Sequence, residues 1–335
     1  MTAARRVLPT PTFGSPLAAA FMRFLETKRA AGYRYREEAW ALGALDRFLV
    51  PVLVPGDPIL SLDIARAFVA KRGVESETTR AHRLTLVREV CRFLALEERR
   101  TAVVPPRWLG IHRRPFVPRV LTHDEGRRFL LACGTLRTQP SSPIRDTVLG
   151  TALVLLYLTG LRAGEALRLT EADVDVGAAV IRVRDTKFGK SRLVPIGADV
   201  SIRLRECQRV VARHFRAREP DAPFFPAPSG HAYSIIALRA AFHQTLASAE
   251  IPRRRAGRTL RLHDLRHSFA VLRVLLWYRQ QADLGVVLPA LATYLGHVGI
   301  ASSQRYLQLT EELVTEITRR HDARFGHLIT DGDSR

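Results

Sequence analysis

Apolar residues recur at helical spacing through the first hundred positions of the chain. Leu17, Phe21 and Phe24 lie three or four residues apart and therefore share one helix face. The same spacing predicts four helices, over residues 16–31, 36–50, 62–71 and 77–96. We expect a flexible lead-in over 1–14 and a small all-helical domain over 15–100.

The helical pattern stops at residues 101–118, which contain four prolines together with several arginines. Proline disfavours helix at its own position and at the residue before it. This segment is therefore expected to be an extended, basic linker between two domains.

After the linker the pattern alternates between helical and strand spacing. Thr122 and Glu125 have the spacing of a capping box, which predicts the start of a helix. Partly alternating β-branched residues over 178–184 and 192–196 predict two strands joined by a turn-like segment. Further helices are predicted over residues 146–158, from 163 onward, and over 200–216, 234–249, 263–277, 288–295, 302–309 and 311–324.

These elements predict a mainly α fold with a small β-hairpin or sheet, arranged as two domains. The second domain is expected over residues 119–325, followed by a tail over 326–335.

The composition is that of a globular protein, with 335 residues, 47% hydrophobic residues and three cysteines that share no metal-ligand spacing. It excludes a disordered chain, a collagen-like fibre and a small disulfide scaffold, and it favours the reduced cytoplasmic compartment. No secretory signal is expected, because the first 16 residues hold no continuous apolar stretch. No membrane partner is expected either, since the apolar run between Asp146 and Arg162 is shorter than the ~20 residues that span a bilayer.

The charge of the chain points to a polyanionic partner. Basic residues number 52 against 32 acidic ones, a formal net charge of +20, and the excess is spread over both predicted domains. Such a field favours nucleic acid, although an arginine-rich composition alone can produce it. Only four of the basic residues are lysines, and two of these, Lys187 and Lys190, stand close together in DTKFGKSR. An amine can give up its proton near neutral pH and a guanidinium cannot, so these lysines are candidates for chemistry.

Arg162 and Glu165 stand at the start of a predicted helix, in the segment TGLRAGE. Arg162 is either a surface arginine near a helix cap or a clamp that directs two N–H groups onto a phosphate. Glu165, one turn later, is either an ordinary first-turn acid or a group that orients a neighbouring cation.

The segment HDLRH offers His263, Arg266 and His267 on one helix face. Two histidines four residues apart suggest a metal site, but the glutamate of HExxH is missing and no third ligand has matching spacing. We therefore expect no metal. Taken alone, His297 reads as a capping or exposed histidine and Tyr306 as a half-buried core residue.

The order of these elements along the chain is more specific than any one of them. TGLRxxE, a lysine in a hairpin, HxxRH, LGH and a tyrosine nine residues later resemble the tyrosine recombinase family, also called phage-type integrases. The resemblance covers residues 119–325, and the helical first domain is similar to that family's core-binding domain. Carried over position by position, it implies a catalytic set of Arg162, Lys187, His263, Arg266, His297 and Tyr306, with Glu165, Lys190 and His267 in supporting positions.

The resemblance implies that Tyr306 attacks a DNA phosphate and forms a 3′-phosphotyrosyl bond, so that rejoining through a Holliday junction needs neither metal, ATP nor another cofactor. The expected partners are double-stranded DNA, three further copies of the chain in a tetramer on two DNA sites, and accessory recombination proteins. The last predicted helix, 311–324, docks either on a neighbouring copy or on its own domain.

Two alternatives stay open at this point, a type IB topoisomerase and a catalytically inactive DNA-binding relative. Tyr294 is the competing nucleophile, although it precedes LGH and is expected to pack inward. The stretch between His267 and Gly296 is long for the family, with a loop expected over 280–288. In this it is similar to integrases of some transposons, so the chain is expected to serve a mobile element of either transposon or phage origin.

Overall fold

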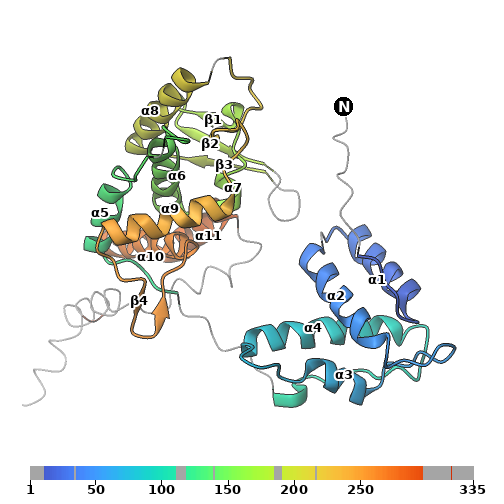
Figure 1. Cartoon of the computed structure of the whole chain (residues 1–335). Coiled ribbons are helices and arrows are strands. Elements are labelled where there is room, and N and C mark those ends of the chain that lie inside the picture. Colours follow the sequence, from blue (N-terminus) through green and yellow to red (C-terminus); the bar gives the residue numbers. More distant parts are fainter. Residues whose placement is uncertain are drawn as a thin grey trace, which may run out of the picture. The chain divides into compact units, whose positions relative to one another are not determined.

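The computed structural model describes residues 11–33, 35–110, 118–138, 140–184, 191–215, 217–296 and 318. The chain divides into two compact units, Met1–Phe116 and Val117–Arg335, and each has its own hydrophobic core (Figure 1). The architecture is mainly helical with small antiparallel sheets, as predicted. Within the described residues, no helix is both long and apolar enough to cross a bilayer.

The first unit consists of four helices: α1 (Ala18–Ala30), α2 (Arg36–Leu49), α3 (Leu62–Val69) and α4 (Glu77–Leu94). All four were predicted from apolar spacing, with ends that differ by two residues at most. Their inward faces meet in one core that includes the fully buried Phe21, Phe24 and Leu42. Serine side chains cap the starts of α3 and α4, which explains why both helices begin where the sequence pattern places them.

The beginning of the proline-containing segment, up to residue 110, packs onto this first unit. Thr101 and Val104 are buried, and the Ala102 N–H donates to the carbonyl oxygen of Leu60 at 3.1 Å. A short 3₁₀ turn, η1 (Trp108–Gly110), ends the described part of the segment.

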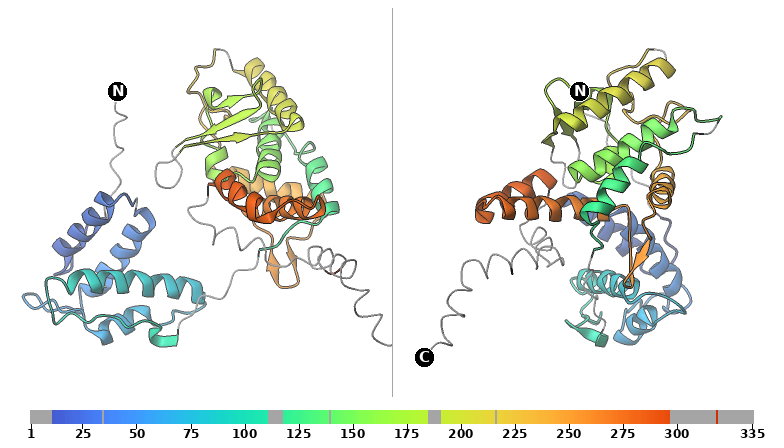
Figure 2. Two further views of the ribbon diagram at one scale, coloured as in Figure 1. Left: turned by 180° about the vertical axis from the view of Figure 1, so that it is seen from behind. Right: turned by 90° about the vertical axis from the view of Figure 1, so that its left-hand side faces the viewer.

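The second unit contains the helices α5 (His123–Ala132), α6 (Arg145–Thr159), α7 (Ala163–Ala166), α8 (Ala198–His214), α9 (Ile235–Ser248), α10 (Asp264–Arg279) and α11 (Leu284–Leu295). The capping box that predicted α5 is present, since Thr122 and Glu125 exchange hydrogen bonds of 3.1 Å. The apolar helix α6 packs against α8, α9 and α10 and forms the centre of the unit (Figures 1 and 2). At Gly150 a Cβ atom would lie only 2.2 Å from the carbonyl oxygen of Cys133, so the absent side chain lets α6 approach the end of α5.

A three-stranded antiparallel sheet covers one side of this unit, with the strand order β1 (Val174–Asp175), β2 (Val180–Val183), β3 (Arg192–Pro195). The predicted hairpin of β2 and β3 is present, in a register that pairs Ile181 with Val194 and Val183 with Arg192. A two-residue β1 and a second ribbon, β4 (Arg254–Arg255) with β5 (Arg258–Thr259), were not predicted. Their strands are too short for an alternating pattern to be recognised.

The expected loop over 280–288 is wrong in its second half. Helix α11 begins at Leu284, four residues before the predicted start, because Asp283 caps it by accepting the Gly285 N–H at 2.8 Å. Pro289 lies inside the helix and removes one backbone hydrogen bond, while buried Leu291 and Leu295 hold the helix against α10. The helices predicted over 302–309 and 311–324 lie outside the described residues.

Candidate active site

Arg162 stands where α6 ends and α7 begins, on a turn that depends on glycine. Gly160 has a φ of +64°, in the left-handed region, and a Cβ there would lie 2.6 Å from the Phe269 ring. The backbone N–H of Arg162 then donates to the Glu165 carboxylate at 3.0 Å and fixes the start of α7. The Arg162 guanidinium, about one-third exposed, extends to the carbonyl oxygen of Gly296 at 3.3 Å.

Arg266, in the first turn of α10, also reaches the end of α11. Its side chain is fully buried, which is rare for arginine and requires partners. Nη1 donates to the carbonyl oxygen of Gly160 at 2.9 Å, and Nη2 donates to that of Leu295 at 2.7 Å.

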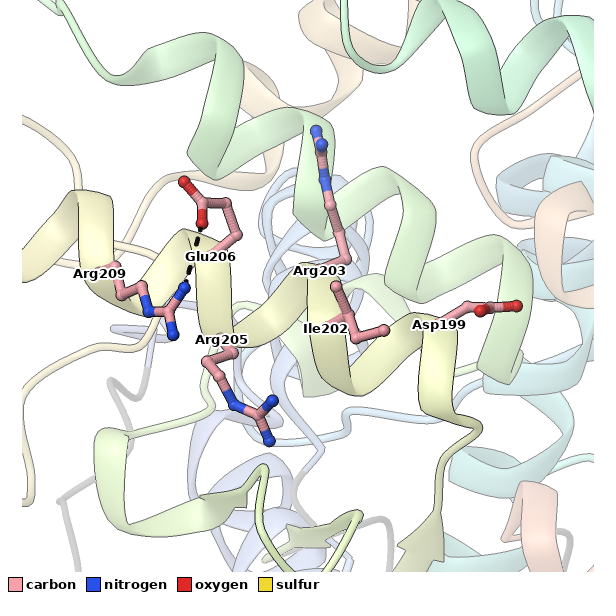
Figure 3. A pocket seen from close by; sticks show the side chains of 6 residues that line it. All are labelled: Asp199, Ile202, Arg203, Arg205, Glu206 and Arg209. Atoms are coloured by element: carbon pink, nitrogen blue, oxygen red, sulfur yellow. Dashed lines mark ion pairs between the residues drawn. The ribbon is translucent and has the colours of Figure 1, made fainter.

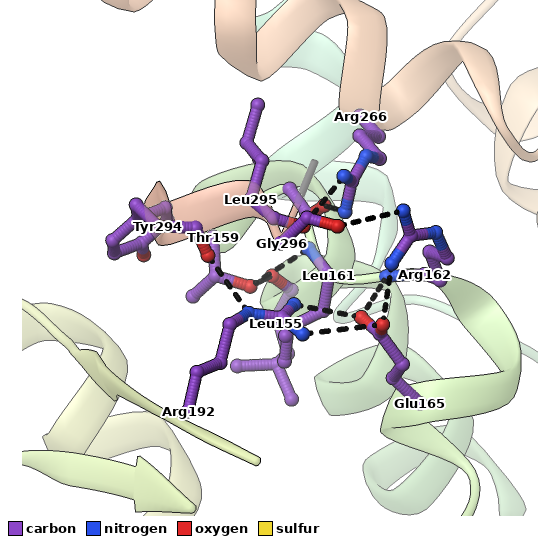
Figure 4. Close-up of polar contacts among 11 residues, drawn as sticks. Leu155, Thr159, Leu161, Arg162, Glu165, Arg192, Arg266, Tyr294, Leu295 and Gly296 are labelled. Carbon is purple, nitrogen blue, oxygen red and sulfur yellow. Dashed lines mark hydrogen bonds and ion pairs between the residues drawn. The ribbon is translucent and has the colours of Figure 1, made fainter. Parts of the chain in front are cut away.

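Arg162 and Arg266 therefore bind the consecutive carbonyls of Leu295 and Gly296 at the end of α11 (Figure 4). The last carbonyls of a helix lack intrahelical partners and carry its partial negative charge, so they bind cations well. Gly296 ends the helix with a φ of +69°, as a C-terminal glycine commonly does. The Leu295–Gly296 turn and the two arginines predicted to be catalytic thus form one cluster.

The carboxylate of Glu165 contacts Arg162 of this cluster. It is almost fully buried and accepts from Arg162 Nη1 at 2.7 Å and from Arg192 Nη2 at 2.8 Å. Burial alone would raise the pKa of Glu165, but the hydrogen bonds and charges of Arg192 and Arg162 outweigh it and lower the pKa to about 2. Glu165 is thus both a first-turn acid of α7 and the partner of two guanidinium groups.

Arg192 is a residue that the sequence interpretation used only as a strand marker. From the start of β3 it also donates, through Nε, to the carbonyl oxygen of Tyr294 at 2.8 Å. Arg192 therefore ties the base of the hairpin to Glu165 and to the end of α11 (Figure 4). The sequence did contain a signal that Arg192 points into the domain. It is two residues from the apolar Val194 and therefore lies on the same, inward face of the strand.

His263 directly precedes α10 and is exposed to solvent. Desolvation, and then the charges of Arg266 and Arg162, lower its pKa to about 4, so the imidazole is neutral near pH 7. Its ring meets that of His267 edge to face, with centroids 5.0 Å apart. Within the described residues, no three histidine, cysteine or acidic side chains gather in a way that could hold a metal ion.

Tyr294 packs inward, as expected. Its ring stacks on Phe269 with centroids 5.6 Å apart, and its hydroxyl donates to the carbonyl oxygen of Pro195 at 3.4 Å. Burial raises its pKa to about 12, which disfavours the phenolate.

The structure brings together three of the six predicted catalytic residues, Arg162, His263 and Arg266, together with Glu165. The other three predicted catalytic residues and one supporting residue lie outside the described part of the chain: Lys187, His297, Tyr306 and Lys190.

Comparisons with known proteins identify the family of the chain. The sequence model of the phage integrase family matches residues 119–312. A Sinorhizobium fredii protein named as a candidate integrase/recombinase, y4rE, is 33% identical over 306 residues, which cover 89% of this chain and 93% of that protein. The tyrosine recombinase XerD of Ralstonia nicotianae is 27% identical over 80% of this chain and 81% of its own length.

Solved structures show the same fold. The Tn1549 transposon integrase in complex with transposon right end DNA superposes with a TM-score of 0.65 at 17% identity, over 90% of this chain and 98% of that one. A λ integrase fragment in a dimer bound to a core site gives a TM-score of 0.57 at 14% identity, over 86% of this chain and 94% of that one.

The family match and these relatives define a DNA strand-breaking and rejoining enzyme. The chain belongs to the phage integrase family of tyrosine recombinases, and it acts on DNA as a site-specific recombinase.

Glu165→Gln tests the arginine cluster. Removing the buried charge leaves two guanidinium groups without their shared counterion, so the free energy of unfolding at pH 7 should fall by about 3 kcal/mol. Because the pKa of Glu165 is lowered on folding, its stabilisation is complete above about pH 4.5 and is lost as the pH falls toward 2. The difference between wild type and variant in urea denaturation should therefore shrink across this range.

Glu206→Gln is the matched control, since Glu206 forms only an exposed ion pair with Arg209 on α8. It should change the unfolding free energy little at any pH. Equal stability of wild type and Glu165→Gln at pH 7 would contradict a structural role for this carboxylate.

Proposed function

We propose that Tyr306 is the nucleophile of this recombinase and that Arg162 and Arg266 bind the phosphate it attacks. The observation that carries the proposal is the convergence of both guanidinium groups on the Leu295–Gly296 turn. A phosphate that contacts the exposed part of Arg162 there lies in the field of both positive charges. Fixed charges of this kind are commonly the largest catalytic contribution, about 3–4 kcal/mol for each well-placed donor.

The reaction exchanges one phosphodiester for another. The Tyr306 oxygen bonds to phosphorus, the bond from phosphorus to the 5′ oxygen breaks, and the leaving strand departs as a 5′ hydroxyl. In the reverse direction a 5′ hydroxyl, from the same or a partner strand, displaces the tyrosine. Because the phosphotyrosyl bond retains the bond energy, rejoining requires no ATP.

His263 is proposed to accept or relay the proton of the attacking hydroxyl. Its lowered pKa keeps it neutral near pH 7, and a neutral imidazole is able to accept a proton. His297, which directly follows Gly296, is proposed to donate a hydrogen bond to the same phosphate. Its attachment to the turn held by Arg162 and Arg266 supports this role.

Lys187 is proposed to protonate the departing 5′ oxygen. It belongs to the segment that joins β2 to β3, and Arg192 anchors the base of that hairpin to Glu165. We propose Glu165 and Arg192 as positioning residues that hold the hairpin, α7 and the end of α11 in one arrangement. Lys190 and His267 would support this frame without chemical roles.

The wider assembly follows from the chemistry. Two rounds of strand exchange through a Holliday junction require four active sites, which supports a homotetramer on two DNA sites, with accessory proteins as further partners. The helical first unit would act as a core-binding domain that encloses the duplex, and the net charge of +20 supports this interaction. The natural setting of such an enzyme is the bacterial cytoplasm, where it would move a transposon or phage element.

A type IB topoisomerase would share this chemistry. The matches to integrases and Xer recombinases over most of the chain favour recombination over simple relaxation.

The nucleophile can be tested with a nicked suicide duplex, whose sequence is selected from random duplexes by binding to the full chain. Wild type should form a covalent protein–DNA adduct in the presence of a chelator, visible as a band shift on a denaturing gel. Tyr306→Phe removes the attacking oxygen and should form none. Tyr294→Phe, the matched control, should still form the adduct. Adduct formation by Tyr306→Phe together with its loss in Tyr294→Phe would reassign the nucleophile.

The general acid can be tested by changing the leaving group. Lys187→Ala should slow cleavage of the normal duplex by about 10²–10⁴-fold, the usual contribution of general acid catalysis. A duplex with sulfur in place of the 5′ oxygen needs no proton to leave, so there the variant should cleave at nearly the wild-type rate.

Lys190→Ala is the matched control for this experiment and should slow neither substrate strongly. Equal slowing of both substrates by Lys187→Ala would remove Lys187 from the acid role.

A further inference from the structure

The ribbon of β4 and β5 is the most strongly charged short element of the described chain. Five arginines occur within residues 253–261, with no acidic residue among them. The strands join through Ala256 and Gly257, both with positive φ, which is the two-residue turn favoured in tight hairpins. In Figure 1 the ribbon projects from the body of its unit.

The ribbon is anchored at its base and exposed along its length. Leu260 is buried, and its N–H donates to the carbonyl oxygen of Arg253 at 2.7 Å. Arg119 donates to the carbonyl oxygen of Pro252. Every residue from 252 to 259 is exposed to solvent. The ribbon is therefore fixed to the core at its base, and its own side chains remain exposed.

Its charges are not explained by folding. Arg255 and Arg258 are directly opposite each other on neighbouring strands, an arrangement that destabilises a sheet when both charges have one sign. Among the described residues the only carboxylate near them is Glu125, 3.8 Å from Arg255, and it already pairs with Arg119 at 2.8 Å. Within the described residues, the ribbon thus carries more positive charge than the one carboxylate near it can balance.

We propose that this ribbon binds the phosphate backbone of the DNA duplex beside the phosphate that is cut. The inference rests on the proposed function, because it takes the position of the cut from the arginine cluster. Arg258 and His263 are five positions apart, so their Cα atoms are at most about 18 Å apart. At about 3.4 Å of helix axis per phosphate on one strand, this separation corresponds to about five base pairs.

DNA backbone fits the ribbon better than a protein partner does. The substrate of the family is DNA, and arginine side chains stand on both faces of the ribbon, Arg254 on one and Arg255 with Arg258 on the other. Guanidinium groups bind phosphate oxygens through paired N–H donors and need no particular base sequence. The ribbon would therefore add affinity and hold the duplex in register without reading its sequence.

A basic patch elsewhere in the same unit provides the comparison. Arg205 and Arg209 are exposed on α8, beside a shallow hollow that also contains Asp199 and Glu206 (Figure 3). Arg209 lies 3.8 Å from Glu206, so this patch has internal counterions. Figures 1 and 2 show α8 and the ribbon at opposite ends of the unit.

The test measures how DNA affinity of the full chain depends on salt. Fluorescence anisotropy with a labelled duplex carrying the selected site gives the slope of log affinity against log salt concentration. Each lost phosphate contact should make the slope shallower by about one. Arg255→Gln with Arg258→Gln should therefore reduce it by about two, and Arg255→Lys with Arg258→Lys should keep it near wild type. Arg205→Gln with Arg209→Gln should leave it unchanged.

A wild-type slope in the double glutamine variant, or an equal decrease in the α8 variant, would overturn the proposal. Thermal unfolding provides a check on folding, because removing the opposed arginines should leave the melting temperature unchanged or higher.

Adduct formation on the suicide duplex distinguishes a failure of the ribbon proposal from a failure of the proposed cleavage chemistry. If wild type forms the adduct but the ribbon variant keeps the wild-type slope, the ribbon proposal fails and the recombinase chemistry stands. If wild type forms no adduct while the slopes change as expected, the chemistry fails and the ribbon contact stands.

Discussion

The contact on which the rest of the site depends is that of two arginines with the end of one helix. Arg162 and Arg266 come from different helices, and both donate to the terminal carbonyls of α11. Positive charge at this point is favoured by the helix dipole and by carbonyls that have no partner within the helix. The same contact brings together the starts of α7 and α10 and the Leu295–Gly296 turn, where three of the five family motifs lie.

Two like charges held this close need compensation, and Glu165 supplies it from within the protein. Its carboxylate is shared by Arg162 and Arg192, and Arg192 in turn holds the base of the β2–β3 hairpin. In this network the attraction of Arg162 and Arg192 for Glu165 outweighs the cost of burying the carboxylate, as the lowered pKa of Glu165 indicates. The network also fixes geometry, because the hairpin, α7 and α11 cannot shift independently without leaving a buried charge unpaired.

Much of this architecture could be read from the sequence. Apolar spacing located the four helices of the first unit, and the Thr122–Glu125 box located α5. The sequence motifs identified Arg162, His263 and Arg266 as candidates. The contacts of the two arginines could not be predicted, because Arg162 and Gly296 are 134 positions apart and Arg266 and Gly160 are 106 positions apart. The start of α11 was missed because its signal, the Asp283 cap, was not recognised in the sequence. The role of Arg192 was missed because its partners Glu165 and Tyr294 lie 27 and 102 positions away in the sequence.

Whether Arg162 and Arg266 act on one phosphate can be seen in a crystal structure of Tyr306→Phe bound to its duplex. Guanidinium nitrogens of both arginines should lie within about 3 Å of non-bridging oxygens of a single phosphate, the ordinary range of a hydrogen bond. Arginines that contact two different phosphates, or a duplex bound away from the Leu295–Gly296 turn, would contradict it.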